Sequence, residues 1–500
     1  MDWGLGLAAL MLAALGAGAP FASDEVWSIR TVSLGYAEMM DTLRGDVHPP
    51  LFYHLLLAWT VVFGQSEWAV RGLTGFLYLL SVLAFRGLAR ETLPSGARTL
   101  ACTVYLASPL ALLAAHFGRM YSLLALLSVL SIHRFLRLCR DDARPFDLLT
   151  WAAVNAIGAL THVWFFFLLF AQAVAMAVLI PPRRWLRPGG AFLLSLIPYS
   201  VIWLPTLLRQ LSRSGETAAW LGRPSAGDLG SVALMYGGAL WVVLPLAMPA
   251  IWRKVRAGAP PVETTGAPGA GTTRIAALLL VVTLAVPFSI SFVKPVFYSR
   301  FAIVALPVFV LLTADLLWRF LTPRASRHAA LLMLLIMCGF EAARRLTPDE
   351  CSSRWTARYL DERASPGDAV IFTSLSRLAT EHYLTPGGPG AAAWRTSFPA
   401  EIDEHPGYEG AVIQNPGAIE AEADALMERI GGATASGSVR RVFLFHGYRP
   451  EADELLEPRL AERYEREDAA CRTCSQARNY YYRISVYHTR EESGRDVASH

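Results

Sequence analysis

Residues 3–21, WGLGLAALMLAALGAGAPF, form an apolar run with no charged side chain. A helix of this length can cross a hydrocarbon core of about 30 Å. The preceding Met1-Asp2 supplies no basic segment, so the run is predicted to be an uncleaved helix and not a secretion signal. Further apolar runs bring the prediction to about eleven spans. They lie near residues 67–88, 99–115, 119–138, 147–161, 163–180, 190–208, 231–251, 275–293, 302–320 and 328–345.

The composition agrees with a membrane protein. Of the 500 residues, 54% are hydrophobic and 17% are charged, which is too apolar for an ordinary soluble chain. The runs are continuous in Leu, Ala, Val and Phe and lack the short alternation of barrel strands. The predicted fold class is therefore mainly α, with a polytopic transmembrane helical bundle over residues 1–346 and a small α/β domain over residues 347–500.

Arginine and lysine mark one side of the predicted bundle. Because short cytoplasmic loops carry an excess of these residues, the marked loops are predicted to face the cytoplasm. With an odd number of spans, the tail then emerges on the periplasmic or extracytoplasmic side of a bacterial inner membrane. The net charge of +4 is explained by this signal, so no nucleic-acid partner is expected. The marked loops hold Arg86, Arg90, Arg98, Arg134, Arg137, Arg140, Arg144, Arg183, Arg184, Arg187, Arg253, Lys254, Arg256, Arg274, Arg319, Arg324 and Arg327.

The first outer loop, residues 22–66, begins with an acidic pair. Asp24 and Glu25 follow directly on the first span. Carboxylates held at the membrane surface are suitably placed to act as a general base on a lipid-borne substrate. The other interpretation is that the pair only marks where the helix leaves the lipid.

A rigid turn follows in the same loop, at Gly45-Asp46-Val47-His48-Pro49-Pro50-Leu51. The two prolines hold the backbone extended, which gives Asp46 and His48 a defined direction. The pair could bind a divalent metal, orient a sugar hydroxyl, or be a rigid turn with a satisfied histidine. The segment from Leu51 to Phe63 is too short to span and is predicted to be a helix along the membrane interface. Its aromatic residues suited to the headgroup level are Phe52, Tyr53 and Trp59.

Cationic side chains recur in other outer turns. Arg119, in His116-Phe117-Gly118-Arg119-Met120-Tyr121, is costly at this depth unless paired, and its fork suits phosphate or carboxylate. With Lys294 and Arg300 it could clamp a lipid phosphate, although each cation alone is better explained by snorkelling. A lone histidine such as His162 more often has a structural role than a role in substrate binding. The candidate substrate-binding residues are Asp46, His48, His116, Arg119, Tyr121, His162, Lys294, Tyr298 and Arg300.

The tail is predicted to fold as the α/β domain. Helix-like stretches at residues 354–363 and 419–430 alternate with strand-like runs at residues 369–373, 441–446 and 480–487. In an oxidising compartment, a disulfide among three tail cysteines is favoured over a metal or catalytic site, because one CxxC pair is too few ligands for zinc. These cysteines are Cys351, Cys471 and Cys474.

Several elements occur along the chain in a defined order. They are Asp24-Glu25, Asp46-Val47-His48-Pro49-Pro50-Leu51, Arg119-Met120-Tyr121, Thr161-His162, Trp203-Leu204-Pro205 with Gln210, and Ser299-Arg300-Phe301. In this order they resemble polytopic glycosyltransferases of the C superfamily, in the branch of bacterial relatives of protein O-mannosyltransferases and of the lipid A aminoarabinose transferase. The resemblance covers about residues 1–346 and extends only loosely to the tail.

The resemblance implies a polyprenyl-phosphate sugar donor, an outward-facing site, inversion at the anomeric carbon and no nucleotide sugar. Carried onto this chain, it makes Asp24 the catalytic base with Glu25 in support. Asp46 and His48 would border the site. The phosphate contacts would be Arg119 and Arg300.

One position departs from the family pattern. Relatives usually have a glutamate two residues before the arginine of the third element, where this chain has Phe117. Either His116 replaces that carboxylate, or the dependence on a divalent metal is reduced.

A transporter or flippase of an amphipathic or lipid-linked substrate is the alternative from another class. Transporters place their binding residues near the bilayer midplane on broken helices, often in two related halves. Here the polar residues collect at one surface, which favours an enzyme. A receptor or scaffold would leave the loop acids unexplained. The sugar stays open, as does the acceptor, which could be a glycan, a lipid or a protein.

Overall fold

The computed structural model describes residues 2–46, 48–140, 144–212, 221–256, 270–321, 323–346, 352–373, 375–404, 415–435, 439–447, 450–467 and 483–489. The chain forms two compact units. The first unit comprises residues 1–19, 31–211 and 221–346, and the second comprises residues 20–30, 212–220 and 347–500. The start of the predicted outer loop 22–66 therefore belongs to the second unit and not to the helical bundle.

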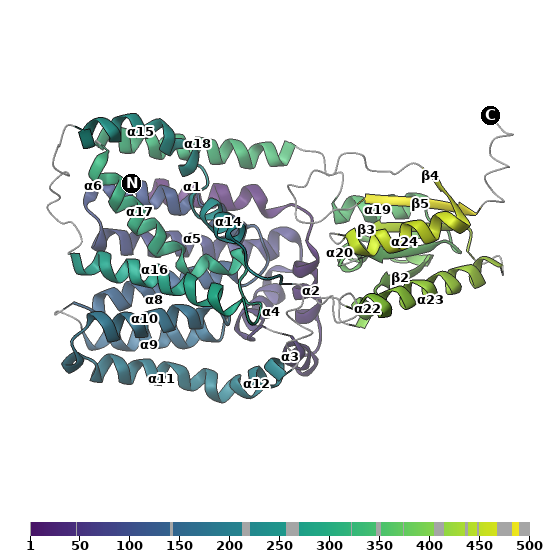
Figure 1. The fold of residues 1–500 in the computed structure, drawn as a ribbon, viewed down its shortest axis with the longest axis horizontal. Coiled ribbons are helices and arrows are strands. Elements are labelled where there is room, and N and C mark those ends of the chain that lie inside the picture. The colour runs from purple at the N-terminus through teal and green to yellow at the C-terminus, as the bar shows by residue number, and fades with distance from the viewer. Residues whose placement is uncertain are drawn as a thin grey trace. The chain divides into compact units, whose positions relative to one another are not determined.

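The first unit is a bundle of helices (Figure 1). Helix α2 (Ser23–Ser33) begins in the second unit and ends in the first. The other elements are α1 (Asp2–Ala17), α3 (Tyr36–Gly45), α4 (Leu51–Phe63), α5 (Glu67–Thr92), α6 (Ser95–Leu106), α7 (Pro109–Ala115), α8 (Tyr121–Leu138), α9 (Pro145–Ala159), α10 (Phe165–Leu179), η1 (Pro182–Arg184), α11 (Leu186–Ile202), α12 (Leu204–Ser212), α14 (Ala226–Gly237), α15 (Leu240–Arg256), α16 (Ala270–Ile290), η2 (Ser299–Ala305), α17 (Leu306–Phe320) and α18 (Pro323–Leu346).

Several of these helices have the length and composition to cross a membrane. Within the described residues there are 5 such helices, or up to 8 if each bent helix pair counts as one span. Helices α1, α4 and α10 are shorter and apolar. A mostly helical bundle with apolar helices is thus confirmed, and the count of about eleven spans stays a prediction.

The three bent pairs have identifiable causes. Helices α6 and α7 meet at 52°, α11 and α12 at 64°, and α14 and α15 at 81°. Pro109 opens α7 and Pro205 is the second residue of α12, and a proline cannot continue the hydrogen-bond ladder of a preceding helix. Between α14 and α15, Gly238 has a φ of 46°, which suits glycine.

Helix α4 has the predicted bounds, Leu51–Phe63, but not all of the predicted surroundings. Phe52 and Tyr53 have no exposed surface, so their assignment to the headgroup level is wrong. The next turns carry the exposed apolar side chains instead, with Val61 77% exposed and Val62 71% exposed. The first turn of α4 therefore packs inside the protein.

The second unit is built on a five-stranded sheet with strand order β2-β1-β3-β5-β4. Strand β1 is parallel to β2 and to β3, while β5 is antiparallel to both β3 and β4. In register, Val370 of β1 lies opposite Phe443 of β3. The elements are α19 (Ser353–Arg363), β1 (Ala369–Thr373), α20 (Ser376–Tyr383), α21 (Pro389–Ala392), β2 (Trp394–Phe398), α22 (Glu401–Glu404), α23 (Pro416–Ala435), β3 (Arg441–His446), α24 (Pro450–Arg463), β4 (Tyr464–Glu467) and β5 (Arg483–Thr489).

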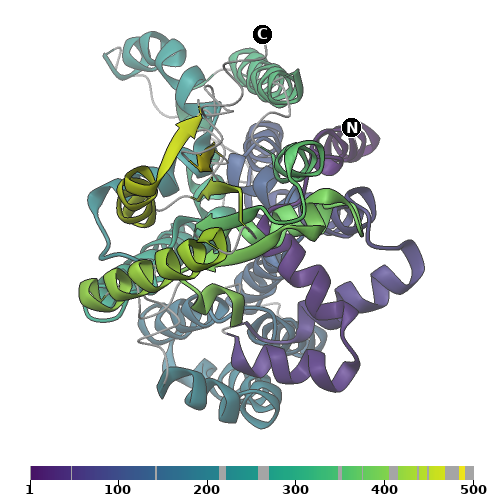
Figure 2. The same ribbon diagram turned by 90° about the vertical axis from the view of Figure 1, so that its right-hand side faces the viewer.

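Helices cover both faces of this sheet (Figures 1 and 2). Ile371 packs in a core with α23 and α24, while its neighbours Val370 and Phe372 pack in a second core with α19. This alternation follows from the two-residue period of a strand. The predicted strands 369–373 and 441–446 coincide with β1 and β3, and the run 480–487 overlaps β5. The proposed disulfide among Cys351, Cys471 and Cys474 lies outside the described residues.

Residues 20–30 are held within the second unit by hydrogen bonds. The backbone N–H of Phe21 donates to Oη of Tyr383 at 2.8 Å, and its carbonyl accepts from Oγ of Ser353 at 2.8 Å. Ser23 Oγ donates to the carbonyl of Leu375, which precedes α20. The side chain of Phe21 is buried and makes an edge contact with the ring of His382. The start of α2 is therefore a packed part of the α/β unit.

Candidate functional site: a cluster of buried arginines and histidines

Asp46, His48 and Arg119 form one line of hydrogen bonds in the first unit. His48 Nδ1 donates to Oδ2 of Asp46 at 3.0 Å, and Nε2 accepts from Nη2 of Arg119 at 3.4 Å. Asp46 and Arg119 are each 5% exposed. The carboxylate thus places the proton of His48 on Nδ1 and leaves Nε2 as the acceptor for the guanidinium.

The backbone around Asp46 is fixed by the end of a helix and by a glutamine. Asp46 caps the C-terminus of α3, and its N–H donates to the carbonyl of Thr42 at 3.1 Å. Gln210 of α12 is buried, and its Nε2 donates to the carbonyls of Asp46 and of Arg44. Carbonyls at a helix end lack partners within the helix, so this amide holds the turn in place.

Arg119 is also anchored by Tyr53. Its Nη1 donates to Oη of Tyr53 at 3.3 Å. This contact was not predicted, because Tyr53 was assigned to the membrane interface. Its burial at the first turn of α4 follows from the Pro49-Pro50 turn, which starts α4 directly beside Asp46 and His48.

His162 joins the cluster from the turn between α9 and α10. Its Nδ1 accepts from the N–H of Trp164 at 3.1 Å, which places the proton on Nε2. The ring centroid lies 5.6 Å from that of His48 and 4.8 Å from that of Phe301. Nε2 of His162 is buried and has no hydrogen-bond partner among the described residues.

The pKa of His162 is held well below its ordinary value of 6.5. Burial is the main cause, and the charges of His48 and Arg119 add to it. The imidazole is therefore neutral at physiological pH, and its Nε2–H is a buried donor near the guanidinium of Arg119.

Arg300 lies in η2 and contacts the cluster through Phe117. Its Nη2 donates to Oη of Tyr298 at 3.0 Å, and the residue is 8% exposed. The guanidinium carbon lies 5.1 Å from the ring centroids of both Tyr298 and Phe117. At the position where relatives usually have a glutamate, this chain thus offers an aromatic face to a cation.

Tyr121, at the first turn of α8, connects the two halves of the cluster. Its ring stacks on Phe117 with centroids 6.0 Å apart and lies 6.1 Å from Phe301 and 6.2 Å from His162. A chain of contacts therefore runs between the two arginines. The candidates that the structure brings together are Asp46, His48, Arg119, Tyr121, His162, Tyr298 and Arg300.

His116 is used in packing between helices. Its Nε2 donates to the carbonyl of Leu12 in α1 at 2.7 Å, and its Nδ1 lies 3.8 Å from Oε2 of Glu341 in α18. The ring fills the space above Gly16, where an added Cβ would lie 2.2 Å from Cγ of the imidazole. These contacts explain His116 without a substrate. For Lys294, no side-chain partner is found within the described part of the chain.

Asp24 and Glu25 lie in the first turn of α2, in the part that belongs to the second unit. Glu25 is 1% exposed, and its Oε2 accepts from the N–H of Ala22 at 2.9 Å. This carboxylate therefore serves the start of the helix. Asp24 is partly exposed, so it is the more accessible acid of the pair.

The Asp46–His48 pair does not fit a divalent metal. One ring nitrogen of His48 is bonded to Asp46 and the other faces the guanidinium of Arg119, so neither is directed at a metal. A cation beside a metal ion is also repelled. Within the described residues, no group of three or more His, Cys, Asp or Glu side chains could hold a metal ion.

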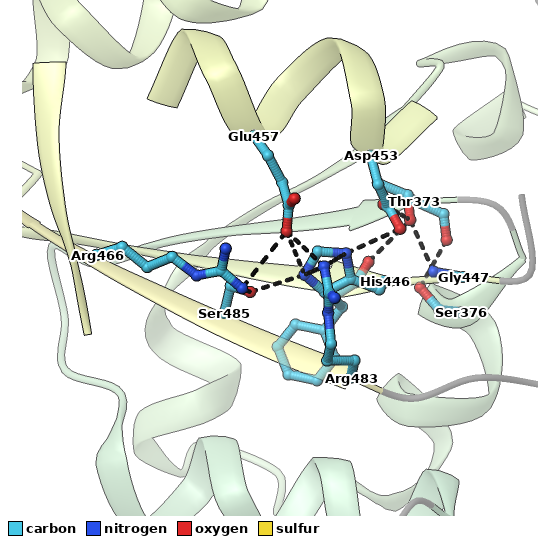
Figure 3. A network of polar contacts seen from close by, with 10 residues as sticks. Thr373, Ser376, His446, Gly447, Asp453, Glu457, Arg466, Arg483 and Ser485 are labelled. Atoms are coloured by element: carbon cyan, nitrogen blue, oxygen red, sulfur yellow. Dashed lines mark hydrogen bonds and ion pairs between the residues drawn. The ribbon is translucent and has the colours of Figure 1, made fainter. Parts of the chain in front are cut away.

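A second polar network lies in the α/β unit and was not singled out from the sequence (Figure 3). His446, at the end of β3, has Nδ1 2.8 Å from Oδ2 of Asp453 and Nε2 2.9 Å from Oγ of Ser485. The order resembles a Ser-His-Asp relay. Ser485, however, has no exposed surface and accepts from Arg466 at 3.1 Å. A hydroxyl enclosed in this way cannot attack a substrate, so the network joins α24 to the sheet.

A family model matches part of the first unit. Residues 47–207, which include His48, Arg119, Tyr121 and His162, match the family described as dolichyl-phosphate-mannose-protein mannosyltransferase. No curated protein matches the chain in sequence.

Two solved structures share the fold over nearly the whole chain. ArnT from Cupriavidus metallidurans in the apo state has a TM-score of 0.56 and 14% identity, covering 95% of this chain and 93% of that chain. The same protein bound to undecaprenyl phosphate has a TM-score of 0.55 and 13% identity, covering 97% of each chain. At these identities the likeness shows the fold. Together with the family match over residues 47–207, it agrees with the resemblance to polytopic glycosyltransferases of the C superfamily.

Proposed function

We propose that this protein transfers a sugar from a polyprenyl-phosphate donor to an acceptor hydroxyl at the outer face of a bacterial inner membrane, with inversion at the anomeric carbon. The donor assignment rests on Arg119 and Arg300, which are both buried and are linked through the contacts of Phe117, Tyr121, His162 and His48. Arginine side chains within a membrane protein commonly mark the site of an anionic group. A phosphate ester is the anion that guanidinium groups bind best, through paired hydrogen bonds.

The lipid part of the donor favours this location. ArnT has been solved with undecaprenyl phosphate, and this chain shares its fold. The cluster lies at the first turn of α8, one end of an apolar helix long enough to cross a membrane. A phosphate at that level keeps its isoprenoid chain within the hydrocarbon core.

The proposed reaction is a single displacement. The acceptor oxygen loses its proton to a carboxylate and attacks the anomeric carbon from the face opposite the phosphate. The bond between the anomeric carbon and the phosphate oxygen breaks, and its electron pair stays on the phosphate. Arg119 and Arg300 stabilise the charge that develops there, which is the usual role of fixed cations at a leaving group. The neutral Nε2–H of His162 supplies a further donor.

Asp24 is the proposed base on the strength of the resemblance, with Glu25 supporting the turn that presents it. The test is Asp24→Asn in purified protein supplied with undecaprenyl phosphate carrying a radiolabelled sugar and with a membrane extract as the source of acceptor. Loss of a general base lowers the rate about 10²- to 10⁴-fold. Equal transfer by wild-type protein and Asp24→Asn would remove Asp24 from the mechanism. Glu25→Gln is the matched control and should act mainly on stability.

A transporter or flippase is the second candidate, because the three bent helix pairs are the kind of broken helix that transporters use. The same assay separates the two functions. An enzyme produces labelled acceptor and free undecaprenyl phosphate in detergent, where no compartment exists. A flippase only moves the labelled lipid between the leaflets of a vesicle and leaves its sugar in place.

A further inference from the structure

A cavity of about 360 Å³ lies where the ends of α8, α9, α10 and α11 meet. Its volume is in the range of about 300–1,000 Å³ that is typical of small-molecule sites. Apolar side chains including Phe135, Leu138, Met176 and Ile180 form one part of the lining. The other part contains five arginines, which are Arg140, Arg144, Arg183, Arg184 and Arg187.

This cavity is remote from the Arg119 cluster. Tyr121 opens α8 beside that cluster, whereas Leu138 closes α8 at the cavity. Eighteen residues of helix, at about 1.5 Å each, separate the two ends by about 27 Å. The cavity therefore lies at the opposite end of the bundle's helices, where α9 and α11 begin and α10 ends.

Two of the five arginines are already used within the protein. Arg140 donates to the carbonyl of Glu91 at 2.9 Å and lies 3.6 Å from its carboxylate. Arg184 donates to the carbonyl of Arg140 at 2.7 Å, which ties α8 to the segment before α11.

The remaining arginines, Arg144, Arg183 and Arg187, also line the cavity. Among the residues that the structure describes, none forms an ion pair with Arg183 or Arg187, and both side chains are exposed. Nearby Asp147 is bonded to Arg134 and Arg137 instead. The two acids at positions 141 and 142 lie outside the described residues. Within the described part of the chain, the cavity thus offers the guanidinium groups of Arg183 and Arg187 to an anion.

Apolar surface continues outward from the cavity along the same helices. Leu149 of α9 is 65% exposed, Val178 of α10 is 68% exposed and Leu186 of α11 is 88% exposed. A ligand that matches these features has a negative head in the cavity and hydrocarbon chains beside the helices. A free phosphate ion would use only the arginines.

We propose that this cavity binds the phosphodiester headgroup of an anionic phospholipid, with its acyl chains lying along α9, α10 and α11. Basic pockets between membrane helices recognise such headgroups through the forked geometry of arginine. A topological signal requires only that arginines lie on one side of the membrane. It does not require five of them to line one cavity together with apolar side chains.

The test is lipid retention by the full-length protein, measured by native mass spectrometry after reconstitution in nanodiscs with equal parts of phosphatidylglycerol and phosphatidylcholine. Wild-type protein should retain phosphatidylglycerol at least about tenfold over phosphatidylcholine, given the attraction of each arginine for an anionic lipid. Arg183→Gln with Arg187→Gln should lose that preference. Both side chains are exposed, so we expect the double variant to unfold at the same temperature as wild type in detergent.

The matched control is Arg90→Gln with Arg324→Gln, which removes two exposed arginines predicted to face the same side but outside the cavity lining. It should retain phosphatidylglycerol as wild type does. Equal retention of the two lipids by wild type, or an equal loss in both double variants, would overturn the proposal. Displacement of phosphatidylglycerol by millimolar inorganic phosphate would show a free-anion site instead and would also overturn it.

Discussion

The guanidinium of Arg300 lies over the ring of Phe117, with 5.1 Å between Cζ and the ring centroid. An aromatic face attracts the cation without cancelling its charge, which leaves the charge available to a bound phosphate. A glutamate at this position would form an ion pair with Arg300 instead.

Substitution of Phe117 tests this relationship. Phe117→Leu removes the ring and should weaken the binding of undecaprenyl phosphate by about three- to tenfold, corresponding to about 0.5–1.5 kcal/mol. Phe117→Glu should weaken binding further, because the new carboxylate competes with phosphate for Arg300. Titration of undecaprenyl phosphate into purified protein measures both effects. Tighter binding by Phe117→Glu would contradict the explanation.

Arg119 should contribute to donor binding through its positive charge and through the paired N–H donors of its planar guanidinium group. Arg119→Ala removes hydrogen bonds from a charged group, a loss of about 1.5–3 kcal/mol, or about 10- to 100-fold in affinity for undecaprenyl phosphate. Arg119→Lys keeps the charge but not the fork and should recover only part of the binding. Arg209→Ala, on an exposed face of α12, is the control and should bind as wild type does.

His48 should act by orienting Arg119, so the shape of its replacement matters. His48→Gln can place an amide oxygen near the position of Nε2 and should keep much of the activity. His48→Ala leaves Arg119 without this acceptor and should lower transfer about tenfold, in line with a lost hydrogen bond to a charged group. Steady-state rates at saturating donor give the comparison. Equal rates for the two variants would show that the Nε2 contact is irrelevant.

The packing role of His116 can be tested from the opposite helix. Gly16→Ala would drive a Cβ into the imidazole and should destabilise the protein by about 1–3 kcal/mol, seen as a lower melting temperature in detergent. Gly4→Ala, on the same helix with open space around it, should leave stability unchanged or slightly raised. Because His116→Ala removes the obstacle, the double variant with Gly16→Ala should be less unstable than the sum of the single effects. Additive effects would show that the two residues do not touch.

His162 should make stability depend on pH. Its folded pKa is lowered by burial and by nearby cations, so the unfolded chain takes up a proton at a pH where the folded chain does not. Stability should therefore be complete above pH 6.5 and fall as the pH drops below that value. His162→Asn keeps an acceptor for the N–H of Trp164 but cannot titrate, and should flatten this part of the profile. Melting temperatures between pH 5 and pH 8 provide the measurement, and parallel profiles would exclude His162 as the cause.

Much of the helical architecture could be predicted because membrane spans depend on local apolar runs. The limits of α4 followed from Pro50 and from the end of the apolar run at Phe63. The bends in α6/α7, α11/α12 and α14/α15 were not predicted, since an apolar run continues through a bend. Single residues such as Pro109 and Gly238 cause the bends. A hydropathy average over a whole run does not reveal the effect of one residue.

The candidate site was predicted in part for a similar reason. Arg119 and Arg300 could be chosen because a charge in an apolar context is costly wherever it lies. Tyr53 and Phe301 could not be chosen, since aromatic residues are common in every span and only tertiary contacts set these two apart. The packing contacts of His116 could not be predicted, because its partners, Leu12 and Glu341, are far away in sequence.

The hydrogen bonds of Phe21 have a practical consequence for work on the α/β unit. Residues 352–500 produced alone would lack the peptide that bonds to Ser353 and Tyr383, and a buried apolar patch around His382 would meet water. A well-behaved soluble fragment should therefore include residues 20–30, supplied as an added peptide or joined ahead of Ser352 by a flexible tether. Crystallisation or NMR trials that begin at the apparent end of the last membrane helix would start from an incomplete fold.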